Sequence, residues 1–327
     1  MTQPTTPQIP AAAGVSAAPR PPLQVASDFH PEVLRLFDRY VHGLLDRRGF
    51  IDAASKFVLA GATAASLLDA LNPRFVAAQR VPPNDPRLHS EYVELASPDG
   101  NGKVRGYLVR PQKPAGKLPV VLVVHENRGL NPHIEDIARR IALDNFIAFA
   151  PDALFTLGGY PGDEDKAREL FAQLDQTKTR EDFVAAAKHA QKLPHSNGKL
   201  GVVGFCYGGG IANFLATRLP DLRAAVPFYG SAPALEQVPH IKAELLVQLA
   251  ETDERINAAW PAYEAALKAA HVKYEAYQYP GTQHGFNNDT TPRFDQAAAE
   301  LAWGRTIALF NRVLREGAHT HGAHASH

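Results

Sequence analysis

One short segment constrains the fold of this chain more than any other: Gly204-Phe205-Cys206-Tyr207-Gly208-Gly209, which holds its single cysteine. The apolar residues 200–203 precede it and the small residues 210–213 follow it, a pattern that predicts a strand, a sharp turn and a helix. The flanking glycines permit such a turn, which lifts the residue at its tip above the edge of the sheet. The first turn of the helix then points free N–H groups at the reacting atom. Cys206 is the predicted nucleophile, at a position usually held by serine.

Composition limits the classes of protein to consider. The chain has 327 residues, of which 45% are hydrophobic, enough for one large α/β domain with an extension or for two small domains. Its formal net charge is zero, so nothing points to a nucleic-acid partner. A single cysteine cannot form an intramolecular disulfide, which weakly favours the cytoplasm but also suits a protein that folds before export.

Alternating apolar segments predict the architecture of the main domain, 81–316, which follows a proline-rich linker at 81–86. Two alternating strands around the turn Asp99–Gly102 predict an antiparallel hairpin. After it, continuous apolar strands alternate with helices, which indicates a doubly wound, mostly parallel α/β sheet with an antiparallel N-terminal hairpin. The expected strands are 91–95, 104–109, 119–124, 146–150, 200–205, 224–229, 243–249 and 273–279, and the expected helices are 134–142, 164–174, 180–192, 209–218, 260–271 and 293–315.

The N-terminal region allows two interpretations. Residues 1–30 are rich in Pro, Ala, Thr and Gln and are expected to be disordered. Within 31–80, Arg47-Arg48 followed by a mildly apolar stretch resembles a twin-arginine export signal, with a candidate cleavage site at 75–79. This interpretation places the protein in the periplasm. The alternative is a helical extension that packs on the main domain or on a second subunit, which leaves a homo-oligomer open.

Two further segments carry minor expectations. The apolar stretch 57–71 is short and rich in Ala and Gly, so no stable membrane insertion is expected. The tail 317–327 contains four histidines, and a solvated, disordered tail is preferred over a metal site.

A nucleophile at a strand-to-helix turn needs a base, and the base needs an acid that orients it. His284 follows the last predicted strand and Asp253 follows the strand before it, so both should lie at the sheet edge that carries Cys206. Glu251 is the rival acid, and Asp253 could instead cap a helix. The alternatives are a buried, inert cysteine and a histidine without a catalytic role.

Together these motifs resemble the dienelactone hydrolase (carboxymethylenebutenolidase) family, which has the α/β-hydrolase fold and a Cys-His-Asp triad. The loop His125-Glu126-Asn127-Arg128-Gly129 agrees with this resemblance. The resemblance implies that Glu126 contacts the resting nucleophile and helps to deprotonate it once substrate binds. It also implies an oxyanion hole formed by the backbone N–H groups of Asn127 and Tyr207.

The sequence departs from the family pattern at the substrate site. Dienelactone-cleaving members hold the substrate carboxylate with two arginines, and neither of those two positions carries arginine here. We therefore expect a neutral ester or lactone in a more apolar pocket. Arg128 is expected to form a surface salt bridge, and the alternative is that it replaces the missing arginines as an anion binder. The residues predicted to line that pocket are Phe155, Leu157, Tyr160 and Phe286.

The expected function is hydrolysis of a small-molecule ester or lactone through attack by Cys206, without cofactor or metal. A thiolate forms a thioester that water must then cleave, which suits activated esters. The main alternative is a non-catalytic binding protein on the same fold. A redox-sensing thiol is less favoured, because the chain offers no second cysteine to resolve it.

Overall fold

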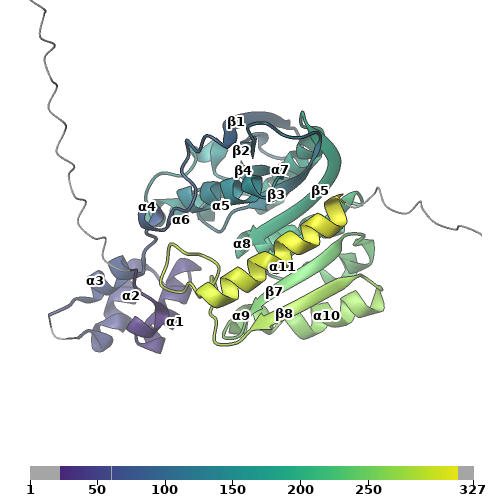
Figure 1. Cartoon of the computed structure of the whole chain (residues 1–327). Coiled ribbons are helices and arrows are strands. Elements are labelled where there is room, and N and C mark those ends of the chain that lie inside the picture. Colours follow the sequence, from purple (N-terminus) through teal and green to yellow (C-terminus); the bar gives the residue numbers. More distant parts are fainter. Residues whose placement is uncertain (1–22, 60, 316–327) are drawn as a thin grey trace, which may run out of the picture.

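A computed structural model describes residues 23–59 and 61–315 of the chain. Its centre is an eight-stranded sheet in the order β1-β2-β4-β3-β5-β6-β7-β8 (Figure 1). Strand β2 pairs antiparallel with both β1 and β4, and all other neighbours are parallel. This confirms the α/β-hydrolase fold with its N-terminal hairpin. The strands are β1 Leu88–Ser97, β2 Gly102–Pro111, β3 Leu118–Val124, β4 Ile147–Asp152, β5 Ser196–Phe205, β6 Leu222–Phe228, β7 Glu244–Ala250 and β8 Tyr274–Tyr279.

Helices cover both faces of the sheet, as expected for strands with continuous apolar runs. Helices α5 (Pro132–Leu143) and α11 (Gln296–Arg315) pack on one face. The other face is covered by α7 (Gln176–Gln191), α8 (Tyr207–Arg218) and α10 (Trp260–Ala269). Every residue of β3 is buried, so the strand that leads to the Glu126 loop is fixed from both sides.

Residues 31–80 form a helical extension beside the main domain, shown in purple in Figure 1. It contains α1 (Pro31–Val41), α2 (Arg47–Ala54), α3 (Ala64–Leu71) and the short α4 (Phe75–Ala78), together with the 3₁₀ turn η2 (Ser55–Phe57). The extension has its own apolar cluster, which includes Phe37, Phe50 and Leu68. Because α1 has one apolar and one polar side, its buried residues form the contact with α2.

The described chain differs from the sequence prediction at its N-terminal end. Residues 23–30 were expected to be disordered, but Ala26–Asp28 form the 3₁₀ turn η1 and Phe29 is buried in the cluster of the extension. An apolar ring that reaches a core fixes a segment that its composition alone would leave loose. Residues 1–22 and the His-rich tail 317–327 lie outside the described residues.

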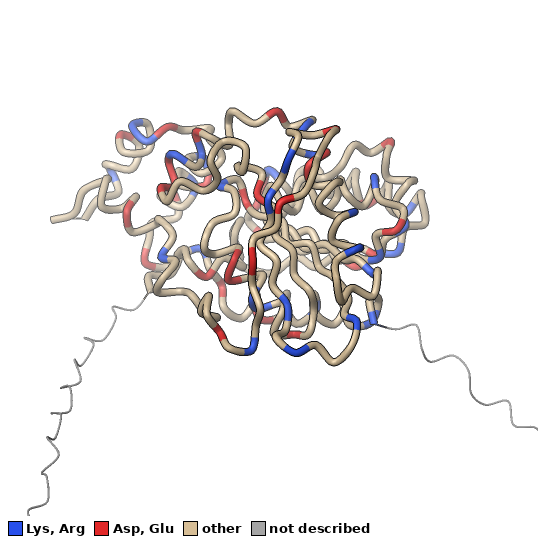
Figure 2. Tube along the Cα trace, turned by 90° about the horizontal axis from the view of Figure 1, so that it is seen from above, with Lys and Arg blue, Asp and Glu red and all other residues tan. Residues whose placement is uncertain are grey.

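Short elements complete the chain: η3 (Phe155–Leu157), α6 (Glu164–Ala172), η4 (Leu235–His240) and α9 (Glu254–Asn257). Basic and acidic residues are interspersed along the trace, so neither sign gathers in one part of the chain (Figure 2). None of the helices in the described ranges combines the length and the apolar character needed to cross a membrane.

Candidate active site

Cys206 lies at the tip of a tight turn between β5 and α8. Its backbone adopts φ 57° and ψ −115°, a strained conformation for a residue with a side chain, and its N–H donates to the carbonyl of Phe228 at 3.0 Å. Glycines make the turn possible: a Cβ on Gly204 would lie 1.8 Å from the carbonyl oxygen of Gly208, and one on Gly208 would lie 2.2 Å from that of Val124. The predicted strand, turn and helix are therefore present, with the thiol at the turn.

His284 and Asp253 meet at the same end of the sheet. The imidazole Nδ1 of His284 lies 2.5 Å from Oδ2 of Asp253, and both side chains are buried. The other oxygen of Asp253 accepts the N–H of Ile256 at 3.4 Å, so this aspartate also caps α9. The rival acid Glu251 instead accepts the N–H of Gly281 at 2.6 Å.

The sulfur of Cys206 and the imidazole of His284 lie close to each other. Sγ of Cys206 and Nε2 of His284 lie within 4.8 Å of each other, and Nε2 has no hydrogen-bond partner among the described residues. Burial works against ionisation of the thiol, yet the adjacent imidazoles hold the pKa of Cys206 well below its usual range. Burial likewise opposes the charge on His284, but Cys206 and Asp253 raise its pKa to about 10. Both shifts favour the charged forms, a thiolate on Cys206 and an imidazolium on His284.

Glu126 lies on the loop that follows β3 and lines the same cavity as Cys206. Its Oε2 accepts a hydrogen bond from the Asn288 amide at 3.0 Å, and among the described residues no hydrogen bond joins it to Cys206. Burial and then the nearby thiolate raise the pKa of Glu126 to about 7. The carboxyl group can therefore gain or lose a proton near neutral pH.

The loop that carries Asn127 is held by the extension. The side-chain amide of Asn127 donates to the carbonyl oxygen of Val41 at 2.8 Å, and Arg128 donates to the same oxygen at 3.2 Å. Tyr207 is the first residue of α8, so its N–H is one of those left without an intrahelical acceptor. Both residues implied as oxyanion donors thus lie near Cys206. Asn127 lines the same cavity, and Tyr207 follows Cys206 directly at the start of α8.

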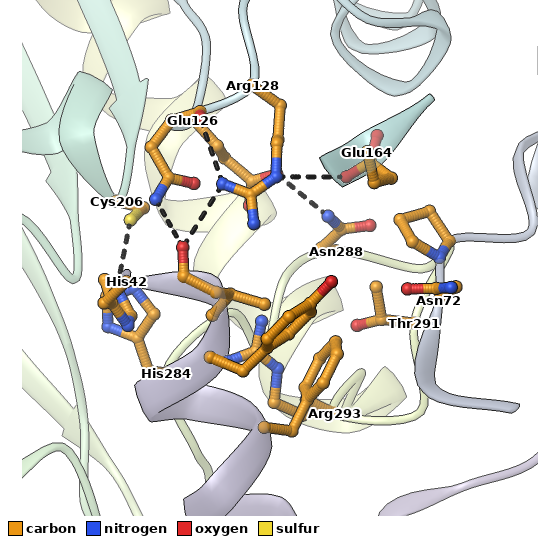
Figure 3. A pocket seen from close by; sticks show the side chains of 15 residues that line it. His42, Asn72, Glu126, Arg128, Glu164, Cys206, His284, Asn288, Thr291 and Arg293 are labelled. Carbon is orange, nitrogen blue, oxygen red and sulfur yellow. Dashed lines mark hydrogen bonds and ion pairs between the residues drawn. The ribbon is translucent and has the colours of Figure 1, made fainter. Parts of the chain in front are cut away.

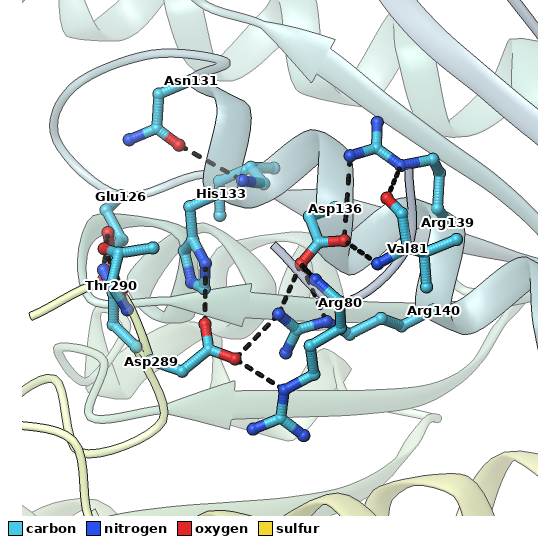
Figure 4. A network of polar contacts seen from close by, with 12 residues as sticks. Arg80, Val81, Glu126, Asn131, His133, Asp136, Arg139, Arg140, Asp289 and Thr290 are labelled. Carbon is cyan, nitrogen blue, oxygen red and sulfur yellow. Dashed lines mark hydrogen bonds and ion pairs between the residues drawn. The ribbon is translucent and has the colours of Figure 1, made fainter. Parts of the chain in front are cut away.

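A second network fixes the loop that carries Asp289 and Thr290 (Figure 4). Asp289 binds the guanidinium groups of Arg80 and Arg140, each at 2.8 Å. Asp136 on α5 accepts the backbone N–H of Val81 at 2.9 Å and also pairs with Arg140. The network joins the linker after the extension to the loop that carries Asn288, the partner of Glu126.

Figure 3 shows the cavity that contains the thiol. Residues of the extension form one wall, and the loops after β3, β5 and β8 form the others. None of the four residues predicted to line an apolar pocket lies on it: Phe286 is fully buried in the core, Leu157 is 37% exposed, and Phe155 and Tyr160 pack elsewhere. The lining residues are Phe37, Tyr40, Val41, His42, Asn72, Pro73, Glu126, Asn127, Arg128, Glu164, Cys206, His284, Asn288, Thr291 and Arg293.

The cavity contains two guanidinium groups at positions other than those of the family pattern. Arg128 was expected on the surface, but it is 5% exposed, with its Nε 3.5 Å from Glu164. Arg293 lines the same cavity and binds Asp38 of the extension at 3.2 Å. The salt bridge of Arg128 was predicted correctly and its location was not, because α6 and the extension close over it.

The residue that sequence reasoning missed is His42. It directly follows α1, and its Nε2 lies 3.6 Å from Sγ of Cys206. Its ligand atom, the thiol sulfur and that of His284 all lie within 4.8 Å of one another, a spacing that would also allow a soft metal ion to bind. The only hint in the sequence was the spacing of Asp38 and His42 on one helix face, which does not reveal that this face meets a thiol.

The sheet, the turn and the thiol, imidazole and carboxylate groups define an α/β-hydrolase with a cysteine at the nucleophile position. The model of the dienelactone hydrolase family matches residues 104–314. The chain belongs to this family, whose members are hydrolases that act on esters or lactones. A second model, described as YqhI-like, matches residues 21–59 and so covers α1 and α2.

Individual relatives agree with the family assignment. The chain is 31% identical over 236 residues to a candidate carboxymethylenebutenolidase of Synechocystis, covering 67% of this chain and 95% of that one. It is 56% identical over 115 residues to YghX, a candidate hydrolase fragment of Escherichia coli K12, covering 35% of this chain and 98% of the fragment. The crystal structure of a candidate dienelactone hydrolase from Klebsiella pneumoniae matches with a TM-score of 0.61 and 28% identity, over 68% of this chain and 99% of that one.

Proposed function

We propose that the chain is a thiol-dependent hydrolase of small esters or lactones, with Cys206, His284 and Asp253 as its triad. The observation that supports this most is the order and placement of three groups: a thiol on a strained turn, an imidazole within 4.8 Å of it, and a buried carboxylate on the far nitrogen of that imidazole. An inert buried cysteine needs neither the strain nor the charged neighbours.

The reaction follows from the protonation states. The thiolate of Cys206 attacks the carbonyl carbon, and the negative charge on the carbonyl oxygen is stabilised by the N–H groups of Asn127 and Tyr207. The imidazolium of His284 donates its proton to the leaving alkoxide, which departs as an alcohol and leaves a thioester. Water then attacks the thioester, the thiolate is expelled, and the acid is released.

Glu126 has a supporting part in this scheme. Its carboxyl group ionises near pH 7 and lies by the thiolate, so its negative charge would oppose that of the sulfur. The protonated form is favoured while the thiolate is present, which helps to keep the sulfur charged and reactive.

The cavity restricts the substrate. Because the extension forms one wall, the acyl group that reaches Cys206 must be small, and the charged lining favours a polar acyl group over a long apolar chain. This differs from the apolar pocket expected from the sequence and keeps activated esters and enol lactones as the substrate class.

The test is a panel of aryl esters and enol lactones assayed with the wild type, Cys206→Ala and the conservative Cys206→Ser. We expect hydrolysis by the wild type and a loss of at least about 1,000-fold in Cys206→Ala. Stoichiometric alkylation of Cys206 by iodoacetamide at neutral pH should abolish the activity. Equal turnover by the wild type and Cys206→Ala would refute the proposal, and a stable complex without turnover would favour a binding protein.

A further inference from the structure

His42 brings a second histidine from a different part of the chain to the thiol of Cys206 (Figure 3). The two residues are 164 positions apart, and Nε2 of His42 lies 3.6 Å from Sγ. The rings of His42 and His284 meet edge to face, with centroids 4.7 Å apart and an interplanar angle of 77°. The extension therefore completes the surroundings of the sulfur.

His42 is oriented in the same way as His284. Its Nδ1 lies 2.7 Å from the backbone carbonyl oxygen of Asp38 and 3.4 Å from the carboxylate of the same residue. A carbonyl oxygen can only accept, so Nδ1 carries the proton and the Nε2 lone pair faces the thiol side. Asp38 is itself held by Arg293 at 3.2 Å. The site thus contains two histidine–aspartate pairs directed at one sulfur.

The two imidazoles differ in their access to water. Nε2 of His284 is buried, whereas the side chain of His42 is 11% exposed and lies next to the exposed Arg255. His42 is therefore the more solvent-accessible of the two imidazoles. Arg255 donates to Nε2 of His42 at 3.0 Å in the resting enzyme, and because its side chain is exposed it can withdraw when the acyl group binds.

We propose that His42 is a second catalytic base, which activates the water that cleaves the thioester formed on Cys206. This inference rests on the proposed hydrolase function. In the step, His42 Nε2 accepts a proton from water as the oxygen bonds to the acyl carbon, and the carbon–sulfur bond breaks to release the thiolate. The product acid gives its proton to His284, which restores the starting imidazolium, and His42 returns its proton to solvent.

The electrostatics of the site agree with this division of roles. Burial lowers the pKa of His42, but Asp38 and the thiolate of Cys206 outweigh burial and raise it above the usual value, against the repulsion from His284. Formation of the thioester removes the charge of the sulfur, and His284 is neutral after it has protonated the alcohol. The loss of the thiolate removes one of the groups that raise the pKa of His42, which favours the neutral imidazole with a free Nε2 at the stage when a base is needed.

The experiment separates acylation from deacylation with p-nitrophenyl acetate. The full-length wild type, His42→Gln and Cys206→Ala are mixed with excess ester in a stopped-flow instrument, and intact-protein mass spectra are taken during turnover. A chelator is present throughout, because the sulfur and the two imidazoles could also bind a metal ion. His240→Gln is the matched control, since this exposed histidine lies in η4 and does not line the cavity.

In His42→Gln we expect a burst of one equivalent of p-nitrophenol at close to the wild-type rate. Turnover after the burst should be slower by about 100-fold or more, and an acetyl group should accumulate on Cys206. His240→Gln should behave as the wild type. Deacylation of His42→Gln at the wild-type rate, or equal slowing of acylation and deacylation, would overturn the proposal. Failure of the hydrolase function itself is distinct, because then Cys206→Ala would release p-nitrophenol as fast as the wild type.

Discussion

Glu126 should make the stability of the protein depend on pH in a direction opposite to that of most carboxylates. Its pKa rises from 4.5 to about 7 in the folded protein, because burial and the thiolate of Cys206 disfavour the charged form. A difference of that size corresponds to about 3.4 kcal/mol. Below pH 4.5 the group is protonated in both states and costs nothing. Between pH 4.5 and about 7 the unfolded chain ionises this group while the folded protein keeps it protonated, so stability falls over this range and levels off above it.

The perturbation is Glu126→Gln, which keeps the acceptor for Asn288 and cannot ionise. At pH 8.5 the free energy of unfolding of the variant should exceed that of the wild type by up to about 3 kcal/mol, an upper value since the side chain is partly exposed. At pH 4.5 the two free energies should be nearly equal. Urea unfolding at the two pH values, followed by fluorescence, gives both differences. The gain at pH 8.5 should shrink in a Cys206→Ala background, which removes one cause of the raised pKa.

The exposed Glu300 on α11 provides the control, and Glu300→Gln should change the free energy of unfolding by less than about 0.5 kcal/mol at either pH. A Glu126→Gln variant that is destabilised at pH 8.5 would refute the reasoning. So would an equal difference at both pH values, since no titration would then lie between them.

Further predictions concern the acid of the triad and the turn. Asp253→Asn should lower kcat by about 100-fold or more, because the amide no longer fixes the His284 tautomer. The kcat of Glu251→Gln should stay within about threefold of that of the wild type, because Glu251 binds Gly281 instead. Steady-state assays on an aryl ester compare the two variants. Retained activity in Asp253→Asn with loss in Glu251→Gln would reverse the assignment. Gly204→Ala should destabilise the fold by more than about 4 kcal/mol, because its Cβ would overlap the carbonyl of Gly208, whereas Gly304→Ala, which meets nothing within 4 Å, should be neutral or stabilising. Thermal unfolding checks both, and similar melting temperatures would contradict the close approach.

Local patterns in the sequence were sufficient to predict the sheet and the turn. Continuous apolar runs marked the buried strands, and the glycines around Cys206 marked a turn at which backbone meets backbone. The order of Asp253 and His284 after successive strands brought them to one sheet edge, as the contact between them confirms. These features depend on residues near each other in the chain or on the topology of parallel strands.

The walls of the cavity could not be predicted in the same way, because they depend on how a separate helical unit packs on the domain. Phe286 follows the motif histidine, yet it fills the core between Tyr229 and Tyr279, where an aromatic ring gains more from burial than at a polar cavity. His42 is invisible to motif analysis, since its meaning arises only when α1 meets a thiol far along the chain. The charged lining likewise depends on pairs formed across that contact, such as Arg293 with Asp38.

The position of His42 also bears on the two interpretations of the N-terminal region. Cleavage at the candidate site 75–79 would remove α1, and with it His42 and the Val41 carbonyl that holds the Asn127 loop. In the intact chain Arg47 begins α2 and pairs with Asp165 at 3.4 Å, which ties the twin-arginine segment to the main domain.

A catalytic His42 and a cleaved signal are therefore mutually exclusive, whereas export without cleavage is compatible with a catalytic His42. We predict that the active protein keeps residues 31–80. N-terminal sequencing of enzyme recovered from periplasmic and cytoplasmic fractions, each assayed for deacylation, checks this directly. Full activity in a protein that begins after Gln79 would show that neither His42 nor the Val41 contact is needed, because the entire helical extension would then be absent from a working site.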